Sequence, residues 1–349
     1  MNHAAILLIA LSSDGYWLSG STETIQVQWT TEERIPGITL DWRLVCGEAQ
    51  LVSGRVTVTD KNSPPNIRIA VPAVRTHTPM RVAYHIEQAG KIKPIAEGTA
   101  AVEVYPDNLL DGVAKRLSSR YLSVGEQPEA LAKHLYVWDQ PEKLPSLLKQ
   151  AKIKHTSILS DAELSFVLPD VLIVGSNRLE SDTGGQQKLL QLATAGTNVL
   201  ILNQTKPAVL AGYPLVQRTV PAKLAWQKDH PLTASLRWFD PSRGKGDLWA
   251  IRLPASEPAL EIAWWPRESA GKSPASIDSL VVCKNVGRGR IVLCQVPLGS
   301  WRNDPRSQLF LVGALDYLAS PVVPTPSPNR RPQSVEPASH RPASQLVLP

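Results

Sequence analysis

The chain has 349 residues, of which 43% are hydrophobic and 19% charged, and its formal net charge is +6 at pH 7. These values are typical of a soluble globular protein that is long enough for two domains. The basic residues are scattered rather than gathered into a run with aromatic residues between them, so we expect no nucleic-acid binding. No stretch approaches the roughly 20 apolar residues of a membrane span.

The first residues allow two interpretations. Ala4–Leu11 is an apolar run that resembles a signal peptide weakly, because no Lys or Arg precedes it and it is at the short end of the usual ~7–15 residues. The run continues into Ser12–Trp17 in the pattern of a strand, a turn and a second strand. We therefore expect a first β-strand, and a chain that starts partway through a larger architecture.

Residues 1–106 are dominated by short strand-like runs. Turn residues such as Asp14-Gly15 and Pro36-Gly37 separate the runs. Short strands at this spacing predict an immunoglobulin-like β-sandwich. The runs are Ala4–Leu11, Thr24–Thr31, Thr39–Cys46, Gln50–Val58, Asn66–Val71, Met80–Glu87 and Ala96–Tyr105.

Residues 107–320 change to alternating strands and helices. Units of this length predict an open, mostly parallel sheet with right-handed crossovers, an α/β domain of the flavodoxin or class I amidotransferase type. Val286-Gly287-Arg288 predicts a late antiparallel hairpin. The expected strands are Leu135–Trp138, Thr156–Leu159, Val171–Val174, Asn198–Leu202, Lys223–Trp226, Ala259–Trp264, Ser279–Asn285 and Gly289–Val296, and the expected helices are Leu109–Leu117, Pro141–Ala151, Gly185–Ala195 and Arg306–Leu318.

The tail at 321–349 is predicted to be disordered. It is rich in Pro, Ser and Arg and carries too few apolar residues to offset the entropy lost on ordering.

The three cysteines are predicted to be buried free thiols. Cys46, Cys283 and Cys294 are few and far apart, which favours free thiols over a disulfide between Cys283 and Cys294. No CxxC pair or Cys/His cluster indicates a metal site, and no motif indicates a cofactor.

Polar residues follow three of the expected parallel strands. Ligands of open α/β sheets bind at the carboxyl ends of the strands, where the strand order reverses. The candidate ligand-binding residues are Asp139, Ser176, Asn177, Asn203 and Gln204, with His230 as a further side chain that could reach the same rim. Residues of these types also cap helices and turns, and that interpretation is the favoured one.

No catalytic set emerges. Ser176 lacks the second glycine of a Gly-x-Ser-x-Gly elbow, and His230, the histidine available for a triad, lies in Asp229–Leu232, which looks like a turn. No cysteine lies at the elbow 202–205, and no two acids form the positioned pair that glycoside cleavage requires. Trp17, before a turn, and Trp265 are candidates for stacking on a sugar ring.

The order of segments resembles the C-terminal region of family 2-like glycoside hydrolases, the β-galactosidase/β-glucuronidase group. Asp14–Gly20, Thr39–Trp42, Arg75–Pro79 and Val102–Pro106 are similar to their late immunoglobulin-like domain. Five later segments are similar to the glutamine-amidotransferase-like module that is appended to bacterial members of this group and to related β-galactosidases. They are Asp170–Gly175, Gly196–Gln204, Asp229–Leu232, Gly287–Gln295 and Ala314–Leu318. The resemblance covers roughly residues 10–320.

The resemblance implies a function without catalysis. The catalytic barrel of that family needs ~250 residues of its own, and no such pattern exists in this sequence, so no catalytic residue carries over. We expect a non-catalytic accessory region of an exported glycoside hydrolase, with a carbohydrate or the catalytic domain as its partner. The alternatives are a free-standing small-ligand or carbohydrate-binding protein, and a hydrolase with an unrecognised site.

Overall fold

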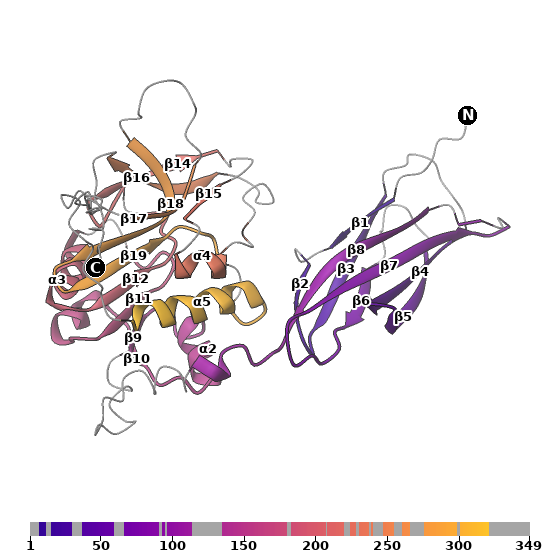
Figure 1. Cartoon of the computed structure of the whole chain (residues 1–349), viewed down its shortest axis with the longest axis horizontal. Helices are drawn as coiled ribbons and strands as arrows, with labels where there is room; N and C mark the ends of the chain where they lie inside the picture. The colour runs from indigo at the N-terminus through magenta and orange to yellow at the C-terminus, as the bar shows by residue number, and fades with distance from the viewer. Residues whose placement is uncertain are drawn as a thin grey trace, which may run out of the picture.

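The structure is a computed structural model. It describes residues 7–11, 15–29, 37–58, 66–90, 93–94, 96–113, 135–179, 183–206, 208–219, 224–227, 230–236, 239, 247–254, 260–265, 276–298 and 301–320. The predicted tail at 321–349 and most of the predicted helix Leu109–Leu117 lie outside these residues. We call residues 7–105 the N-terminal part and residues 108–320 the C-terminal part; Figure 1 shows them joined by the segment that follows β8.

The N-terminal part contains two β-sheets. The three-stranded sheet has the order β1-β3-β6, and the five-stranded sheet has the order β2-β8-β7-β4-β5. All neighbouring strands are antiparallel except β2 and β8. The strands are β1 (Leu7–Leu11), β2 (Tyr16–Leu18), β3 (Thr22–Trp29), β4 (Ile38–Cys46), β5 (Ala49–Val58), β6 (Asn66–Ala70), β7 (Thr78–Gln88) and β8 (Ala96–Tyr105).

Alternation along β4 explains how these sheets pack. Ile38, Leu40, Trp42 and Leu44 point inward and are buried in a cluster shared with β3, β6, β7 and β8. Because successive side chains of a strand point to opposite faces, the residues between them, such as Asp41, lie on the outer face of the five-stranded sheet. Chains of this kind bury one face of each sheet and leave the other to solvent.

The C-terminal part is built on one mixed sheet. Its main path has the order β10-β9-β11-β12-β19-β18-β16-β14-β13, and β17 pairs with β18 and with β15. The strands are β9 (Leu135–Trp138), β10 (Thr156–Ile158), β11 (Val171–Val174), β12 (Asn198–Ile201), β13 (Val209–Leu210), β14 (Tyr213–Arg218), β15 (Ala225–Trp226), β16 (Leu248–Pro254), β17 (Leu260–Trp264), β18 (Ser276–Val286) and β19 (Gly289–Cys294).

The prediction of a mostly parallel sheet holds for half of this sheet. Strands β10, β9, β11, β12 and β19 are parallel, whereas β18, β16, β14 and β13, and the pairings of β17, are antiparallel. The predicted hairpin is confirmed: β18 and β19 pair around Gly287 and Arg288, and Gly287 has a φ of 59°. The hairpin reverses the chain direction, and the antiparallel half is built outward from it.

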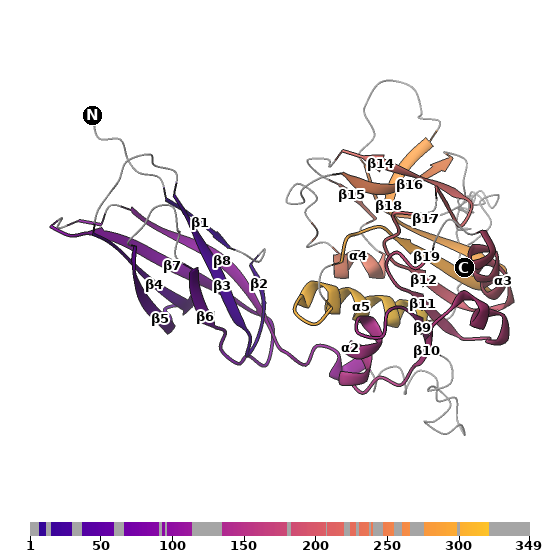
Figure 2. The same ribbon diagram turned by 180° about the vertical axis from the view of Figure 1, so that it is seen from behind.

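Helices cover both faces of the mixed sheet (Figures 1 and 2). One face packs against α2, α4 and α5, and the other against η2, a 3₁₀ helix, and α3. The alternation of β11 serves both, since Ile173 belongs to the first core cluster and Leu172 to the second. The helices are α2 (Leu144–Gln150), η2 (Asp161–Phe166), α3 (Thr183–Ala195), α4 (Pro231–Leu236) and α5 (Pro305–Leu318). None of the helices in the described residues is long and apolar enough to cross a membrane.

The strand order creates a reversal between β9 and β11. From β9 the chain continues through α2 to β10 on one side, and then crosses to β11 on the other side. The loops that leave the carboxyl ends of β9 and β11 therefore diverge. Such a divergence leaves a crevice at the edge of the sheet, which is where ligands of open α/β sheets bind.

Candidate functional site

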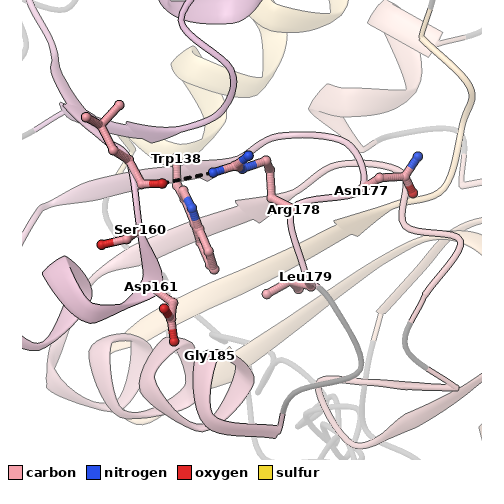
Figure 3. A pocket seen from close by; sticks show the side chains of 8 residues that line it. Trp138, Ser160, Asp161, Asn177, Arg178, Leu179 and Gly185 are labelled. Atoms are coloured by element: carbon pink, nitrogen blue, oxygen red, sulfur yellow. Dashed lines mark hydrogen bonds between the residues drawn. The ribbon is translucent and has the colours of Figure 1, made fainter.

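A pocket lies at the carboxyl ends of β9, β10 and β11, at the point where the strand order reverses. Its volume is about 250 Å³. We call it the switch-point pocket. As Figure 3 shows, its lining comes from the end of β9, the segment after β10, the loop after β11 and the start of α3. The lining residues are Trp138, Leu159, Ser160, Asp161, Asn177, Arg178, Leu179 and Gly185.

Arg178 places a positive charge in the pocket. One terminal nitrogen donates to the main-chain oxygen of Leu159 at 3.0 Å, so the loop after β11 is tied to the loop after β10. The guanidinium carbon lies 5.8 Å from the ring centroid of Trp138, within the range of a cation–π contact. Its Nε is buried and has no hydrogen-bond partner among the described residues.

Trp138 supplies the buried wall. The residue is 5% exposed, and its indole Nε1 has no hydrogen-bond partner within the described part of the chain. A buried donor without a partner costs about 1–3 kcal/mol, so such a donor usually meets a water or a ligand. Two unpaired donors, from Trp138 and Arg178, therefore belong to the lining of one pocket. Both nitrogen atoms are themselves buried in the described part of the chain, so a ligand in the pocket reaches them only if the lining shifts.

Asp161 adds an acceptor on the opposite side. Its carboxylate lies 3.7 Å from Nζ of Lys188, which also donates to the main-chain oxygen of Asp161 at 3.1 Å. The turn that carries it is fixed by Glu163, whose Oε1 accepts from the backbone nitrogen and from the hydroxyl of Ser160, both at 3.1 Å. The pocket thus offers a guanidinium and a carboxylate from two loops that are each held in place.

Asn177 is the residue of the predicted ligand-binding set that lines this pocket. Its φ of 55° is left-handed, which turns the loop sharply after β11. Its Oδ1 accepts from the backbone nitrogen of Thr205 at 2.8 Å and from the hydroxyl at 3.0 Å. Its backbone nitrogen donates to the oxygen of Asn203 at 2.9 Å. Asn177 therefore joins the loops after β11 and β12, as the capping interpretation anticipates.

Asp139 is buried behind the rim. It is 1% exposed, and its carboxylate accepts from the backbone nitrogens of Gln140 at 2.8 Å and of Leu144, the first residue of α2, at 3.3 Å. Burial raises the pKa of this carboxyl group, while the two backbone hydrogen bonds act in the opposite direction. A group enclosed in this way orients the start of α2 and does not face the pocket.

Gln204 fills the rim beyond β12. It is fully buried, its Oε1 accepts from the backbone nitrogen of Leu179 at 3.0 Å, and its Nε2 donates to the oxygens of Gly175 at 2.9 Å and of Leu202 at 2.5 Å. Neighbouring Asn203 is half-buried, and its Oδ1 has no partner among the residues described. The rim at Asp139 and Gln204 is thus occupied by protein.

Ser176 and His230 are not placed as a catalytic pair. Ser176 is half-buried after β11 and lies outside the pocket lining. His230 precedes α4 on the α5 face of the sheet, where its ring meets Tyr317 edge-on at 4.8 Å and its Nδ1 accepts from the nitrogen of Leu232 at 3.3 Å. The expectation that His230 reaches the rim is therefore wrong. Burial, helped by the charge of Arg290, lowers its pKa to about 4.

Trp17 and Trp265, the two residues proposed to stack on a sugar ring, lie in different settings. Trp17 is 1% exposed and belongs to the N-terminal core, so the expectation of an exposed ring is wrong. The alternation of the short strand β2 turns it inward, because the turn begins after Leu18 rather than at the tryptophan. Trp265 is half-buried against the α5 face of the sheet, and its Nε1 donates to the oxygen of Thr219 at 3.3 Å. Neither ring lines the switch-point pocket.

Sequence reasoning missed most of the lining. Arg178 immediately follows the predicted Asn177, but nothing in the local pattern shows which of the two faces inward. Ser160 and Asp161 follow a strand that was expected at Thr156–Leu159, and the pattern Ser160-x-x-Glu163 is a capping box. That signature marks the start of a helical turn at a strand end, and it could have identified this loop.

Hydrolytic chemistry is not apparent in this arrangement. Among the described residues that line the switch-point pocket, Asp161 is the one with a carboxylate, whereas glycoside cleavage uses two. Cys283 and Cys294 are free and buried, and burial raises the pKa of both thiols, that of Cys294 to about 12. A thiol with a raised pKa is a poor nucleophile because the thiolate is the reactive form.

Comparisons with known proteins give no family. No model of a known protein family matches the sequence, and no curated protein matches it either. Similar solved structures include the CARDB domain of a Pyrococcus furiosus protein in complex with di-metal ions, with 8% identity over 30% of this chain and 90% of that chain and a TM-score of 0.22. A marsupial T cell receptor gives 16% identity, 29% and 34% coverage and a TM-score of 0.21. FetP of uropathogenic E. coli gives 17% identity, 28% and 84% coverage and a TM-score of 0.17. At such TM-scores these likenesses carry no argument.

Proposed function

We propose that the chain is a non-catalytic carbohydrate-recognition region that acts beside the catalytic domain of a glycoside hydrolase, and that the switch-point pocket holds one sugar unit. The observation that carries the proposal is the pocket lining. The guanidinium of Arg178 offers donors, the carboxylate of Asp161 offers acceptors, and the ring of Trp138 forms a wall of the pocket. A sugar hydroxyl both donates and accepts, so a ring with several hydroxyls suits this mixture.

The size of the pocket favours a small ligand. Pockets for drug-sized molecules have volumes of roughly 300–1,000 Å³, and the volume here is about 250 Å³. A single sugar unit or a comparably small polar molecule fits this scale. The pocket also opens beside Leu159, which is 61% exposed, so a longer chain of sugar units could continue past the opening.

The resemblance to family 2-like glycoside hydrolases supports the same proposal. Under this resemblance, the N-terminal part corresponds to the immunoglobulin-like sandwich of those enzymes. The C-terminal part corresponds to their amidotransferase-like module without its nucleophile. The order β10-β9-β11-β12-β19 corresponds to the order 2-1-3-4-5 of flavodoxin-type sheets, which bind their ligands at the reversal between the first and third strands.

The test is calorimetric titration of the whole chain with galactose and glucuronate, the sugars that the resembled enzymes release. We expect one of them to bind, and Arg178→Ala to weaken binding at least tenfold. The matched control is Arg288→Ala, because Arg288 also donates to a main-chain oxygen, that of Ala195 at 2.7 Å, away from the pocket. Equal affinity in the two variants, or no binding to either sugar or their oligomers, would contradict the proposal.

The same protein separates binding from catalysis. If the chain is an accessory region, purified protein leaves aryl β-glycosides intact at concentrations where the sugar binds. Hydrolysis at enzyme-like rates that is lost in Ser176→Ala or His230→Ala would show instead a hydrolase with an unrecognised site.

A further inference from the structure

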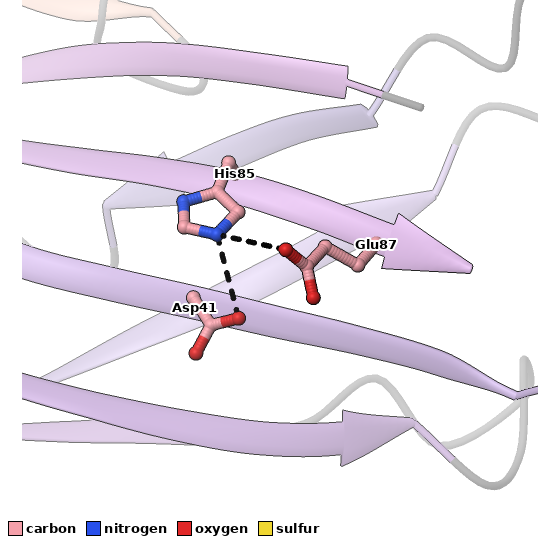
Figure 4. A group of neighbouring side chains, drawn as sticks. All are labelled: Asp41, His85 and Glu87. Carbon is pink, nitrogen blue, oxygen red and sulfur yellow. Dashed lines mark ion pairs between the residues drawn. The ribbon is translucent and has the colours of Figure 1, made fainter. Parts of the chain in front are cut away.

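Three side chains meet on the outer face of the five-stranded sheet, remote from the switch-point pocket. Asp41 lies in β4, and His85 and Glu87 lie in β7 (Figure 4). The register pairs Asp41 directly with His85, and Glu87 is two residues further along on the same face of the strand. These residues are far apart in sequence, so linear spacing gave no sign of a metal site.

The distances in this group are those of ligands around an ion. His85 Nε2 lies 3.5 Å from Oδ2 of Asp41 and 3.5 Å from Oε1 of Glu87. One ligand atom from each residue lies within 4.8 Å of the other two. Direct charge-assisted hydrogen bonds are shorter, about 2.7–2.9 Å. Ligands of a tetrahedral ion with bonds of about 2.0–2.2 Å are separated by about 3.3–3.6 Å, which matches the two spacings around the imidazole.

A second histidine on the same sheet shows the alternative arrangement. His77 Nε2 lies 2.5 Å from Oε2 of Glu103, which is a direct hydrogen bond with no room for an ion between the atoms. Both histidines are exposed to a similar degree, with side chains 46% and 50% accessible for His85 and His77. The longer distance from Nε2 to the carboxylates at His85, compared with His77, is therefore not explained by a difference in exposure to solvent.

A neighbour of the group holds one of its carboxylates, that of Asp41, in place. Arg55 of β5 is paired with Asp41 in the register and donates to its Oδ1 at 2.5 Å and to its Oδ2 at 2.9 Å, which fixes the plane of that carboxylate. Hydrogen bonds of this kind to ligating carboxylates commonly support metal sites. On the other side of His85 the register places Glu97 directly opposite, on β8. Two strands thus hold the ligands, and a third carboxylate lies next to them.

We propose that Asp41, His85 and Glu87 bind a divalent transition-metal ion of the zinc class. An imidazole with carboxylates suits Zn²⁺, Co²⁺, Ni²⁺ or Mn²⁺, whereas Ca²⁺ and Mg²⁺ prefer oxygen ligands alone. Three protein ligands leave a position for water or for a group from a bound partner. The site is independent of the switch-point pocket and of its ligand.

The test is titration of the untagged, chelator-treated whole chain with ZnCl₂ by calorimetry. We expect one site, and a loss of affinity of at least tenfold in His85→Ala and in Glu87→Gln. His77→Ala is the matched control and keeps the affinity, and Cys46→Ser keeps it too, which excludes binding through the half-buried thiol. CaCl₂ should give no comparable heat.

A second readout identifies the ligand atom. On addition of Zn²⁺ we expect the Nε2 resonance of His85, assigned from His85→Ala, to shift in nitrogen-detected imidazole spectra while that of His77 stays in place. Zinc binding that survives in both His85→Ala and Glu87→Gln, or that is lost to the same extent in His77→Ala, overturns the proposal. So does the absence of any binding to the unaltered chain.

Discussion

Gly175 and Asp139 are packed so closely that no side chain fits between them. A Cβ on Gly175 would lie 2.3 Å from both Cγ and Oδ1 of Asp139. The carboxylate cannot retreat, because it is buried and accepts from two backbone nitrogens. This contact sets the distance between the loops that leave β9 and β11, and so the position of Arg178 three residues later.

Gly175→Ala should therefore destabilise the protein by about 1–3 kcal/mol, the usual cost of forcing extra atoms into a packed interior. Urea unfolding at neutral pH measures the change. Gly185→Ala is the matched control in the same pocket region, because its Cβ would lie 3.5 Å from Cη2 of Trp138, an ordinary contact. Alanine in helix α3 should be neutral or stabilising by up to about 1 kcal/mol. Equal losses in the two variants would contradict this explanation.

Gln204→Leu should damage both stability and the pocket. The buried amide pairs with the nitrogen of Leu179 and the oxygen of Gly175, and leucine leaves both backbone groups unpaired. Each unpaired buried group costs about 1–3 kcal/mol. Since Leu179 lines the pocket next to Arg178, we also expect weaker sugar binding.

Chemical denaturation and titration of the same Gln204→Leu preparation check these effects. The control is Gln186→Ala, which removes a hydrogen bond to the nitrogen of Ala211 at 3.0 Å in a half-buried setting. Its cost should be near the ordinary value for one hydrogen bond, about 0.5–1.5 kcal/mol. The idea fails if Gln204→Leu unfolds at the same urea concentration as the unaltered chain.

The lowered pKa of His230 predicts that the free energy of unfolding decreases in mild acid. Its pKa falls from 6.5 to about 4 in the folded chain, chiefly because burial disfavours the charged ring. Between these values the unfolded chain binds the proton and the folded chain does not, so the free energy of unfolding decreases as the pH falls from about 6.5 towards 4. The expected contribution is on the order of 1–3 kcal/mol.

The measurement is urea unfolding at pH 7.5 and at pH 5, for the unaltered chain and for His230→Asn. Other groups titrate in both proteins, including Asp139, whose raised pKa acts in the opposite direction. The difference between the two pH profiles therefore isolates His230. If the variant loses as much stability on acidification as the unaltered chain, the histidine is not the cause.

The sequence predicts the strands around the pocket better than the pocket itself. Runs such as Val171–Val174 and Asn198–Ile201 are apolar and β-branched and are bounded by polar residues, so local pattern is sufficient for them. Strands β14 and β16 were not predicted from the sequence. Pro214 interrupts the strand pattern of β14, and β14 pairs with β16, a distant segment later in the chain. Local propensity carries no information on such long-range pairing. The helix α4 was missed for a related reason: Pro231 reads as a turn residue, but it is also a favoured first residue of a helix.

The site shows the same limit at the scale of single residues. The strand ends named from the sequence lie at the edge of the sheet that holds the pocket, but the loop conformation decides which side chains line it. The left-handed turn at Asn177 brings Arg178 to the pocket, while the side chain of Gln204 points inward and is hydrogen-bonded to the loop after β11. Positive φ at a non-glycine residue depends on tertiary contacts, here the bonds of Asn177 to Thr205, and a single sequence does not reveal it.

The burial of the three cysteines predicts the order in which their thiols react with a thiol reagent. Cys283 and Cys294 are buried in the core, and Cys283 Sγ lies 3.1 Å from the hydroxyl of Tyr317, whereas Cys46 is half-buried. Burial raises the pKa of both core thiols, so their reactive thiolate forms are scarce at neutral pH. In native buffer we expect one thiol, that of Cys46, to react with Ellman's reagent, and Cys46→Ser to abolish the reaction. In denaturant without reductant all three thiols should react. One reactive thiol in denaturant would show instead that Cys283 and Cys294 are joined, and rapid reaction of all three in native buffer would show that the core is open to solvent.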